Sequence, residues 1–280
     1  MKTKKSFSYI IVNLFMCILI LAMIMPIVVL VSGSFMSSID FSFYYQSEKI
    51  SYIKIIPDRF TLFQYFEALI GNTDYTRALT NSTLFSFTST IIALIIAIPA
   101  AYVIVFSSLP CRKIITTAYL ILMLIPYQAI QVLHYIMLSD MGIIGKDVSV
   151  IITNVFDTFE TVILIALFLT IPIEIMEAAS LDGAGSLKSL IYIVLPQLRN
   201  EIIVITLLKF INVWGLTEQP ILFLNDVTQF PLSVMLTDLT KKYPENSFAF
   251  SVVFMMIPLL LFWYYKKDIE NMVDNNVRLK

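Results

Sequence analysis

The sequence predicts an all-α integral membrane protein with six transmembrane helices. Hydrophobic residues make up 58% of the 280-residue chain, and charged residues make up only 14%. A soluble protein of this composition would expose far too much apolar surface, whereas a protein embedded in lipid would not. In addition, six stretches have or approach the length of about 20 apolar residues that a helix needs to cross the hydrocarbon core.

The fourth and fifth of these stretches are less uniformly apolar than the others. Asn154, Asp157 and Glu160 lie in the first half of the fourth stretch. Lys209 lies in the fifth, where we expect it to extend toward the interface or to pair with an acidic neighbour. The six candidate spans are Tyr9–Val31, Asn81–Phe106, Ile114–Leu138, Val148–Thr170, Ile202–Leu224 and Phe248–Tyr265.

The first span follows Lys2, Lys4 and Lys5, a pattern that a secretory signal peptide shares. Its apolar run is longer than the roughly 7–15 residues of a signal-peptide core, and no small-residue cleavage site follows it convincingly. We therefore interpret residues 9–31 as a retained transmembrane helix.

Basic residues near the span ends favour a cytoplasmic location for both termini, in agreement with an even number of spans. The resulting organisation is a cytoplasmic N-terminus at 1–8, the first transmembrane helix at 9–31, an extracytoplasmic connector at 32–76, a five-helix core at 77–265 with a cytoplasmic loop at 171–200, and a cytoplasmic tail at 266–280.

Composition also argues against several classes of function. A net charge of −1 is unsuited to nucleic-acid binding, which requires a basic face. The two cysteines, Cys17 and Cys111, lie on or beside apolar spans, so we expect free thiols and no disulfide. His134 is the single histidine, so a histidine-based metal site is not expected, and no nucleophile–base pair indicates an enzyme.

The polar segment EAASLDGAGSLKSLIYIVLP, which begins at Glu177, separates the fourth and fifth spans. We expect two short helices along the membrane surface, the second ending at Pro196. Gly183 and Gly185 would allow a sharp turn between them, because glycine adopts positive φ without steric penalty. Although GAGSLKS faintly resembles a phosphate-binding loop, the Gly-Lys-Ser/Thr order is missing and no strand precedes it.

This segment resembles the signature of permeases of binding-protein-dependent ABC importers (MetI-like), in which three residues separate EAA from a glycine and nine more separate that glycine from I-x-L-P. The matching positions are Glu177, Ala178, Ala179, Gly183, Ile193, Leu195 and Pro196. The resemblance implies that the loop, including Asp182, couples the membrane helices to a partner ATPase.

Further segments resemble one branch of this family, the second membrane subunit of maltose-type carbohydrate importers. They are PDRFTLFQYFEAL at Pro57–Leu69, the second span with its P-A-A-Y end, and the third span with Pro126. Many relatives have W-N-D before a proline in the fifth span, whereas this chain has WGLTEQP, with Gly215 and Leu216 in place of the polar pair.

The resemblance implies a transporter with several partners. They are a second homologous permease that completes a heterodimer, two ATP-binding-cassette ATPases, an extracytoplasmic solute-binding protein and membrane lipid, with no nucleic acid. The chain itself would need no cofactor and would not be an enzyme, because the partner ATPases use ATP and Mg²⁺. The location implied is the plasma or inner membrane, and the cargo a carbohydrate, an oligosaccharide above all.

Polar residues within spans are candidates for contacts with the solute, because they are costly in lipid unless they face an interior. In the third span these are Gln128, Gln131 and His134, spaced to share one helical face. In the fifth they are Asn212, Trp214 and Glu218, with Gln219 beside them. For each one, hydrogen bonding between helices is the alternative role.

Two other functions stay open. The same machine could carry a solute other than a sugar, such as a sugar phosphate or a peptide-like compound. An ion-driven secondary transporter would need no ATPase, and inverted repeats with an intramembrane acid pair would favour it.

Overall fold

A computed structural model of the chain describes residues 2–46 and 54–278. Within them, the secondary structure is helical apart from one antiparallel bridge between Met36 and Phe60. The predicted all-α fold class is confirmed. Residues 47–53 of the predicted connector, residue 1 and the last two residues of the predicted tail lie outside the described residues.

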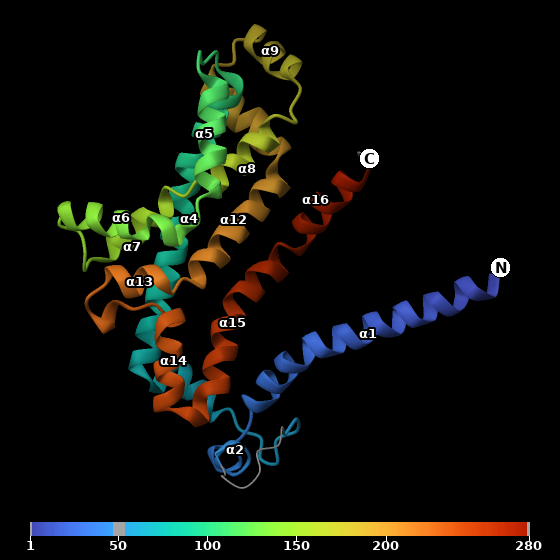
Figure 1. Cartoon of the computed structure of the whole chain (residues 1–280), viewed down its shortest axis with the longest axis vertical. Helices are drawn as coiled ribbons and strands as arrows, with labels where there is room; N and C mark the ends of the chain where they lie inside the picture. The colour runs from blue at the N-terminus through green and yellow to red at the C-terminus, as the bar shows by residue number, and fades with distance from the viewer. Residues whose placement is uncertain (1, 47–53, 279–280) are drawn as a thin grey trace. The chain divides into compact units, whose positions relative to one another are not determined.

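Helices of very different lengths follow one another along the chain (Figure 1). The α-helices are α1 (Lys2–Gly33), α2 (Ser38–Tyr45), α3 (Phe63–Phe66), α4 (Thr73–Phe106), α5 (Arg112–Leu124), α6 (Tyr127–Asp140), α7 (Asp147–Val155), α8 (Phe159–Phe168), α9 (Ile173–Leu181), α10 (Ser186–Ser189), α11 (Leu195–Gln197), α12 (Arg199–Trp214), α13 (Glu218–Phe223), α14 (Leu232–Lys242), α15 (Ser247–Tyr264) and α16 (Lys266–Arg278). Two π-helical turns, η1 (Glu67–Gly71) and η2 (Leu190–Val194), and two 3₁₀ turns, η3 (Val227–Gln229) and η4 (Pro244–Asn246), complete the set.

The chain divides into two compact units. The first comprises the chain up to Thr76 together with Met235–Met256, and the second comprises Arg77–Val234 together with Ile257–Lys280. Helices α4, α14 and α15 contribute residues to both units.

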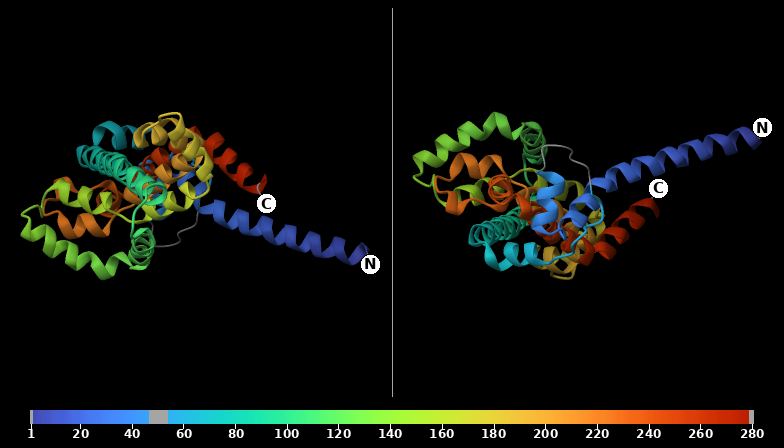
Figure 2. Two further views of the ribbon diagram at one scale, coloured as in Figure 1. Left: turned by 90° about the horizontal axis from the view of Figure 1, so that it is seen from above. Right: turned by 90° about the horizontal axis from the view of Figure 1, so that it is seen from below.

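In the first unit, α1 is one continuous helix in both views of Figure 2. The most apolar 18-residue window of Val12–Gly33 contains no buried residue. A helix with so much exposed apolar surface is stable in lipid or against another subunit.

In the same unit, the start of α4 contacts the first turn of α15. Tyr75 and Phe250 are both fully buried, and their rings stack with centroids 4.4 Å apart. The Tyr75 hydroxyl donates to the carbonyl oxygen of Phe250 at 2.7 Å. This bond joins positions 175 residues apart in sequence.

The core of the second unit lies where α4, α8 and α12 meet. Ala97 and Ala101 on α4 are buried together with Leu164 and Phe168 on α8 and Ile205 on α12. Alanine at such positions lets the helix backbones approach closely, as is typical of helix packing in membranes.

Four helices, or nearly continuous helix pairs, are long and apolar enough to cross a membrane: Val12–Gly33, Thr73–Phe106, Asp147–Phe168 and Pro244–Tyr264. The number rises to six if two bent pairs each count as one span. The prediction of six spans agrees with the higher of these two numbers. The third and fifth predicted spans, however, differ in form from the expectation.

The predicted third span, Ile114–Leu138, consists of α5 and α6, which meet at an angle of 100°. Pro126 causes the break, because proline drives the residue before it out of the helical region, and Ile125 is extended with ψ 119°. The predicted fifth span, Ile202–Leu224, ends as a helix at Trp214, and α13 follows separately. The bent pair counted as a span here is Ser186–Gln197 with Arg199–Trp214, which meet at 85°, so it includes part of the predicted loop at 171–200.

Candidate functional site

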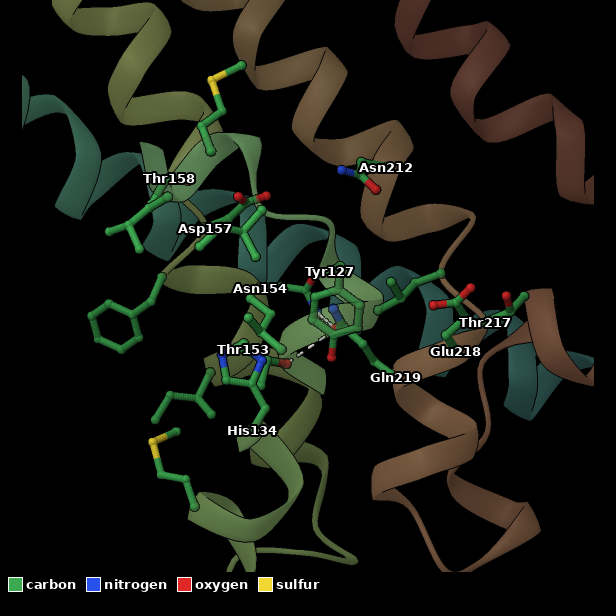
Figure 3. Close-up of a pocket in the computed structure, with 18 of the residues that line it drawn as sticks. Tyr127, His134, Thr153, Asn154, Asp157, Thr158, Asn212, Thr217, Glu218 and Gln219 are labelled. Atoms are coloured by element: carbon green, nitrogen blue, oxygen red, sulfur yellow. Dashed lines mark hydrogen bonds between the residues drawn. The ribbon is translucent and has the colours of Figure 1, made fainter. Parts of the chain in front are cut away.

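A cavity of about 790 Å³ opens in the second unit. Helices α5, α6 and α7, the segment after α7, the end of α12 and the start of α13 all contribute to its wall. The apolar lining residues are Leu122, Met123, Ile125, Ile130, Met137, Met141, Ile152, Phe156 and Leu216, with Gly215 between α12 and α13. Its polar lining residues, labelled in Figure 3, are Tyr127, His134, Thr153, Asn154, Asp157, Thr158, Asn212, Thr217, Glu218 and Gln219.

Three interruptions of helices create this cavity. The bend at Pro126 turns α6 away from α5, residues 156–158 separate α7 from α8, and Gly215 ends α12. Each interruption places side chains from a helix end at the cavity wall, where unbroken spans would have packed against one another. Irregular backbone at membrane depth is tolerated where it lines a polar cavity.

Asn154 and Gln219 form a buried polar contact between α7 and α13. The Asn154 amide donates to the Gln219 side-chain oxygen and also to the carbonyl of Val150, the latter at 2.8 Å. Thr153 donates to the same Gln219 oxygen at 3.2 Å. These bonds fix the wall of the cavity at the start of α13 (Figure 3).

A second polar contact joins α6 to α13. The side-chain amide nitrogen of Gln128 lies 3.3 Å from Oε1 and 3.2 Å from Oε2 of Glu218. Glu218 is exposed and lines the cavity, so much of its capacity to accept hydrogen bonds stays available to a solute.

An ion cluster connects the cavity wall to the packed helices behind it. The Lys209 ammonium on α12 lies 3.2 Å from Asp157 Oδ2 and 3.2 Å from Glu160 Oε1. The side chains of Lys209 and Glu160 are 0% and 1% exposed, whereas that of Asp157 is 37% exposed and lines the cavity. Lys209 was expected either to extend toward the interface or to pair with an acidic neighbour, and in the structure it pairs with two.

The structure brings together part of the predicted solute-contact set. His134, Asn212 and Glu218 line the cavity, and Gln128 contacts it through Glu218. Gln131 is half-buried on α6 but is not a lining residue.

Trp214 also lies away from the cavity lining. It is 3% exposed and stacks on Phe210, with ring centroids 5.6 Å apart. Its position therefore supports packing within the helix bundle.

Sequence reasoning did not single out Tyr127, Thr153, Asn154 and Asp157 as lining residues. The signal for two of them was present, because Asn154 and Asp157 are polar groups within a candidate span, and such groups mark sites by default. Tyr127 and Thr153 carry no such signal.

The segment between the fourth and fifth spans forms the expected helix–turn–helix. Helix α9 ends at Leu181, and Gly183 follows with φ +77°. The N–H of Ala184 donates to the carbonyl of Ala179 at 2.9 Å, which closes the turn. Gly185 has φ −72° and does not need glycine's freedom.

The second helical stretch of this loop runs one residue past its predicted end at Pro196. Helix α10, the π turn η2 and α11 continue to Gln197. Pro196 fits there because it lies in the first turn of α11, where a missing N–H is tolerated.

The loop presents charged and apolar side chains together. Glu177, Ala178 and Asp182 are exposed, and Pro196 is exposed as well. Ala179 is buried, while Ile193 and Leu195 are half-buried. Leu181, Leu187 and Tyr192 are 90%, 69% and 76% exposed. Exposed apolar residues next to polar ones are typical of an interaction surface.

The connection after α13 is fastened to α4 within the second unit. The Asn81 amide donates to the carbonyl of Thr228 at 2.9 Å, and Ser82 accepts from the N–H of Leu232 at 2.7 Å. The N–H of Thr228 donates to Asp226, and this hydrogen bond holds the pKa of Asp226 below its usual value.

Among the described residues, no group of three or more His, Cys, Asp or Glu side chains is placed to hold a metal ion. Cys17 and Cys111 are free, as predicted, and both are exposed. The absence of a cofactor from the chain's own function stays a prediction.

No family model matches the chain. Among curated proteins, it is 25% identical over 234 residues to the sn-glycerol-3-phosphate transport system permease protein UgpE of Brucella abortus (strain 2308), covering 78% of this chain and 83% of that protein. It is 25% identical over the same length to UgpE of Agrobacterium fabrum, and 24% identical over 165 residues to UgpE of Yersinia pestis, where 58% of this chain and 59% of that protein are covered.

Two solved structures have a similar fold. One is a bacterial ABC transporter involved in the import of the acidic polysaccharide alginate, with a TM-score of 0.81, 17% identity and coverage of 95% of this chain and 97% of that chain. The other is the bacterial alginate ABC transporter in complex with a periplasmic protein bound to alginate pentasaccharide, with a TM-score of 0.58, 16% identity and coverage of 94% and 93%.

Proposed function

We propose that this chain forms half of the translocation pathway for a carbohydrate and is coupled to a partner ATPase through the loop at 171–200. The proposal is supported by the similarity of its sequence and fold to permeases of binding-protein-dependent ABC importers. As a permease of this type, the chain is a multi-pass, non-catalytic membrane component. One observation carries the proposal, the exposed helix–turn–helix with Gly183 at φ +77°.

The chemistry of this loop suits a mechanical joint. Glu177 and Asp182 offer exposed carboxylates, and Leu181 and Leu187 offer apolar contacts beside them. A cleft of another protein that receives such a loop needs both kinds of contact. Motion of the ATPase would then be transmitted to α8 and α12 through α9 and α11.

A carbohydrate cargo agrees with the cavity. Its amides, carboxylates and hydroxyls can pair with sugar hydroxyls, and its apolar wall can contact the C–H surfaces of a sugar ring. The names of the relatives mention sn-glycerol-3-phosphate, and those of the similar structures mention alginate. An oligosaccharide is the cargo that we propose.

The proposed assembly contains a second homologous permease, two ATPases that use ATP and Mg²⁺, and a solute-binding protein on the outer side. One of the similar structures contains a periplasmic protein. With the loop facing the ATPases, both termini of this chain would be cytoplasmic, in the plasma or inner membrane.

The test is affinity purification of the tagged chain from its own membranes, with copurifying proteins identified by mass spectrometry. Wild type should bring an ATPase and a second permease, and Gly183→Asp should lose the ATPase. Gly142→Asp is the matched control, because Gly142 also has positive φ (+67°) and open space around it but lies between α6 and α7. Recovery of the chain alone from wild-type membranes would refute the proposal.

One observation favours an ion-driven transporter as a second candidate. Asp157 and Glu160 form an acid pair within a candidate span, although Lys209 lies between their charges. Uptake that follows an ion gradient and continues without ATP would favour this candidate.

A further inference from the structure

We propose that the cavity admits uncharged or amino-substituted sugars and excludes anionic solutes, with Asp157 and Glu218 as the discriminating residues. The inference rests on the proposed function, because it assigns a substrate class to the same cavity. It separates this chain from the relatives and similar structures, whose names mention a phosphate ester and an acidic polysaccharide.

The charged groups in the cavity wall are of one sign. Asp157 and Glu218 both line it, and within the described part of the chain no lysine or arginine does. Among the described lining residues, His134 is the one whose side chain is capable of carrying a positive charge. Asp157 and Glu218 come from different elements of the wall (Figure 3), so a solute in the cavity meets negative charge from more than one direction.

Lys209 does not reverse this balance. Its side chain is fully buried and its ammonium is already shared between Asp157 and Glu160 at 3.2 Å each. One cation against two carboxylates leaves an excess of negative charge. Because the Lys209 side chain is fully buried, an anionic solute could reach this ammonium only by displacing groups that cover it, which is unfavourable when it weakens a buried ion pair.

Among the residues that the structure describes, no lysine, arginine or histidine forms an ion pair with Glu218. Its side-chain partner is the neutral Gln128 amide, with long contacts of 3.2 and 3.3 Å. A carboxylate accepts hydrogen bonds from hydroxyl and ammonium groups but has none to donate to a phosphate or a uronate. Neutral and amino-substituted sugars can therefore bind Glu218, whereas anions are repelled.

The size of this effect follows from Coulomb's law. Within a few Å and at the effective dielectric constant of a protein, one like charge lowers occupancy by an anion by about tenfold or more. Like-charge contacts of this kind are a general means of rejecting the wrong ligand.

The test measures whether the cavity favours cations over anions, and it can be carried out without knowing which solute is transported. In the assembled transporter, Cys17 and Cys111 are replaced by serine and Ile130→Cys places a thiol on the wall. Ile130 is a lining residue with no Asp, Glu, Lys or Arg within five positions in the sequence. The rates of modification by a cationic and an anionic methanethiosulfonate reagent are compared, each relative to a free thiol in solution.

We expect the cationic reagent to be favoured by about tenfold and Glu218→Gln to reduce this preference by at least about threefold. Asp157→Asn should act in the same direction, but Glu218→Gln is the decisive variant because Glu218 takes no part in the Lys209 cluster. Asp238→Asn, which removes an exposed carboxylate on α14, is the control and should leave the preference unchanged. No preference for the cation, or a preference that Glu218→Gln leaves intact, overturns the inference.

A second measurement distinguishes this inference from the proposed function. ATP-driven uptake is compared for a neutral glucose trisaccharide, a glucosamine trisaccharide and a mannuronate trisaccharide. Uptake of the acidic sugar at the rate of the neutral one overturns the charge rule and leaves the carbohydrate proposal standing. Uptake of none of them refutes the carbohydrate proposal, while the modification rates still decide the charge rule.

Discussion

The ammonium of Lys209 lies 3.2 Å from Oε1 of Glu160, and the two side chains are 0% and 1% exposed. This contact joins α12 to α8 at the back of the cavity. Because ionised groups are costly within a membrane, each side chain depends on the other for its place in the bundle.

Removing one partner of this contact should destabilise the protein more than removing both. Lys209→Met leaves Glu160 buried without a cation, which is expected to lower the free energy of unfolding by about 3–5 kcal/mol. The double variant Lys209→Met/Glu160→Met should recover most of this loss, because apolar side chains of similar volume replace a buried pair well. Thermal unfolding of the purified protein in detergent measures both. A single variant as stable as wild type would show that the contact does not stabilise the bundle.

The contact between Asn154 and Gln219 should contribute less. Hydrogen bonds between membrane helices contribute about 0.6 kcal/mol on average and up to about 1.7 kcal/mol. A double-mutant cycle with Asn154→Ala and Gln219→Ala should therefore give a coupling of roughly 1 kcal/mol in unfolding experiments. Additive effects of the two substitutions would contradict the assigned bond.

The sequence allowed the spans and the loop to be predicted, because both depend on local patterns. Runs of apolar residues set the spans, and Gly183 marked the turn that the structure places at positive φ. The bend between α5 and α6 was signalled only by Pro126, and the sequence alone does not distinguish a kinked span from one turned by 100°.

The cavity was harder to predict, because its lining depends on which helix faces meet. In the sequence, Asp157 and Asn154 only interrupt the apolar fourth span. Their partners, on α12 and α13, are given by the structure. Trp214 was a candidate solute contact because aromatic faces can pack on sugar rings. In the structure it is buried in the helix bundle. Long-range contacts of this kind are not encoded in spacing along one helix.

In the first unit, Tyr75→Phe should lower stability modestly. The substitution keeps the ring stacked on Phe250 but removes the hydroxyl that donates to its carbonyl at 2.7 Å. Since a typical hydrogen bond contributes about 1 kcal/mol net, a loss of this size is expected in thermal unfolding. Tyr102→Phe is the matched control, because Tyr102 is also a buried ring on α4, lies against Phe106 with centroids 5.3 Å apart, and forms no side-chain hydrogen bond within the described residues. Equal effects of the two substitutions would argue against the Tyr75 bond.

The last prediction concerns the conformation of Gly183. A Cβ at this position would meet nothing within 4 Å, so the effect of a side chain comes from the backbone, whose φ is +77°. Alanine is disfavoured there by about 1–2 kcal/mol, whereas asparagine visits this region more readily. ATPase recovery and ATP-driven uptake should therefore fall in the order glycine, asparagine, alanine at this position.

Gly185→Ala provides the comparison within the same loop, because Gly185 has φ −72° and equally open space. It should leave ATPase recovery and thermal stability near the wild-type values, whereas Gly183→Ala should lower the stability of the permease by no more than its backbone cost of about 1–2 kcal/mol. If Gly183→Ala and Gly185→Ala reduce recovery equally, side-chain bulk and not backbone conformation governs docking. If neither reduces it, the turn at Gly183 is not part of the coupling surface, because a contact that depends on this conformation cannot survive its loss.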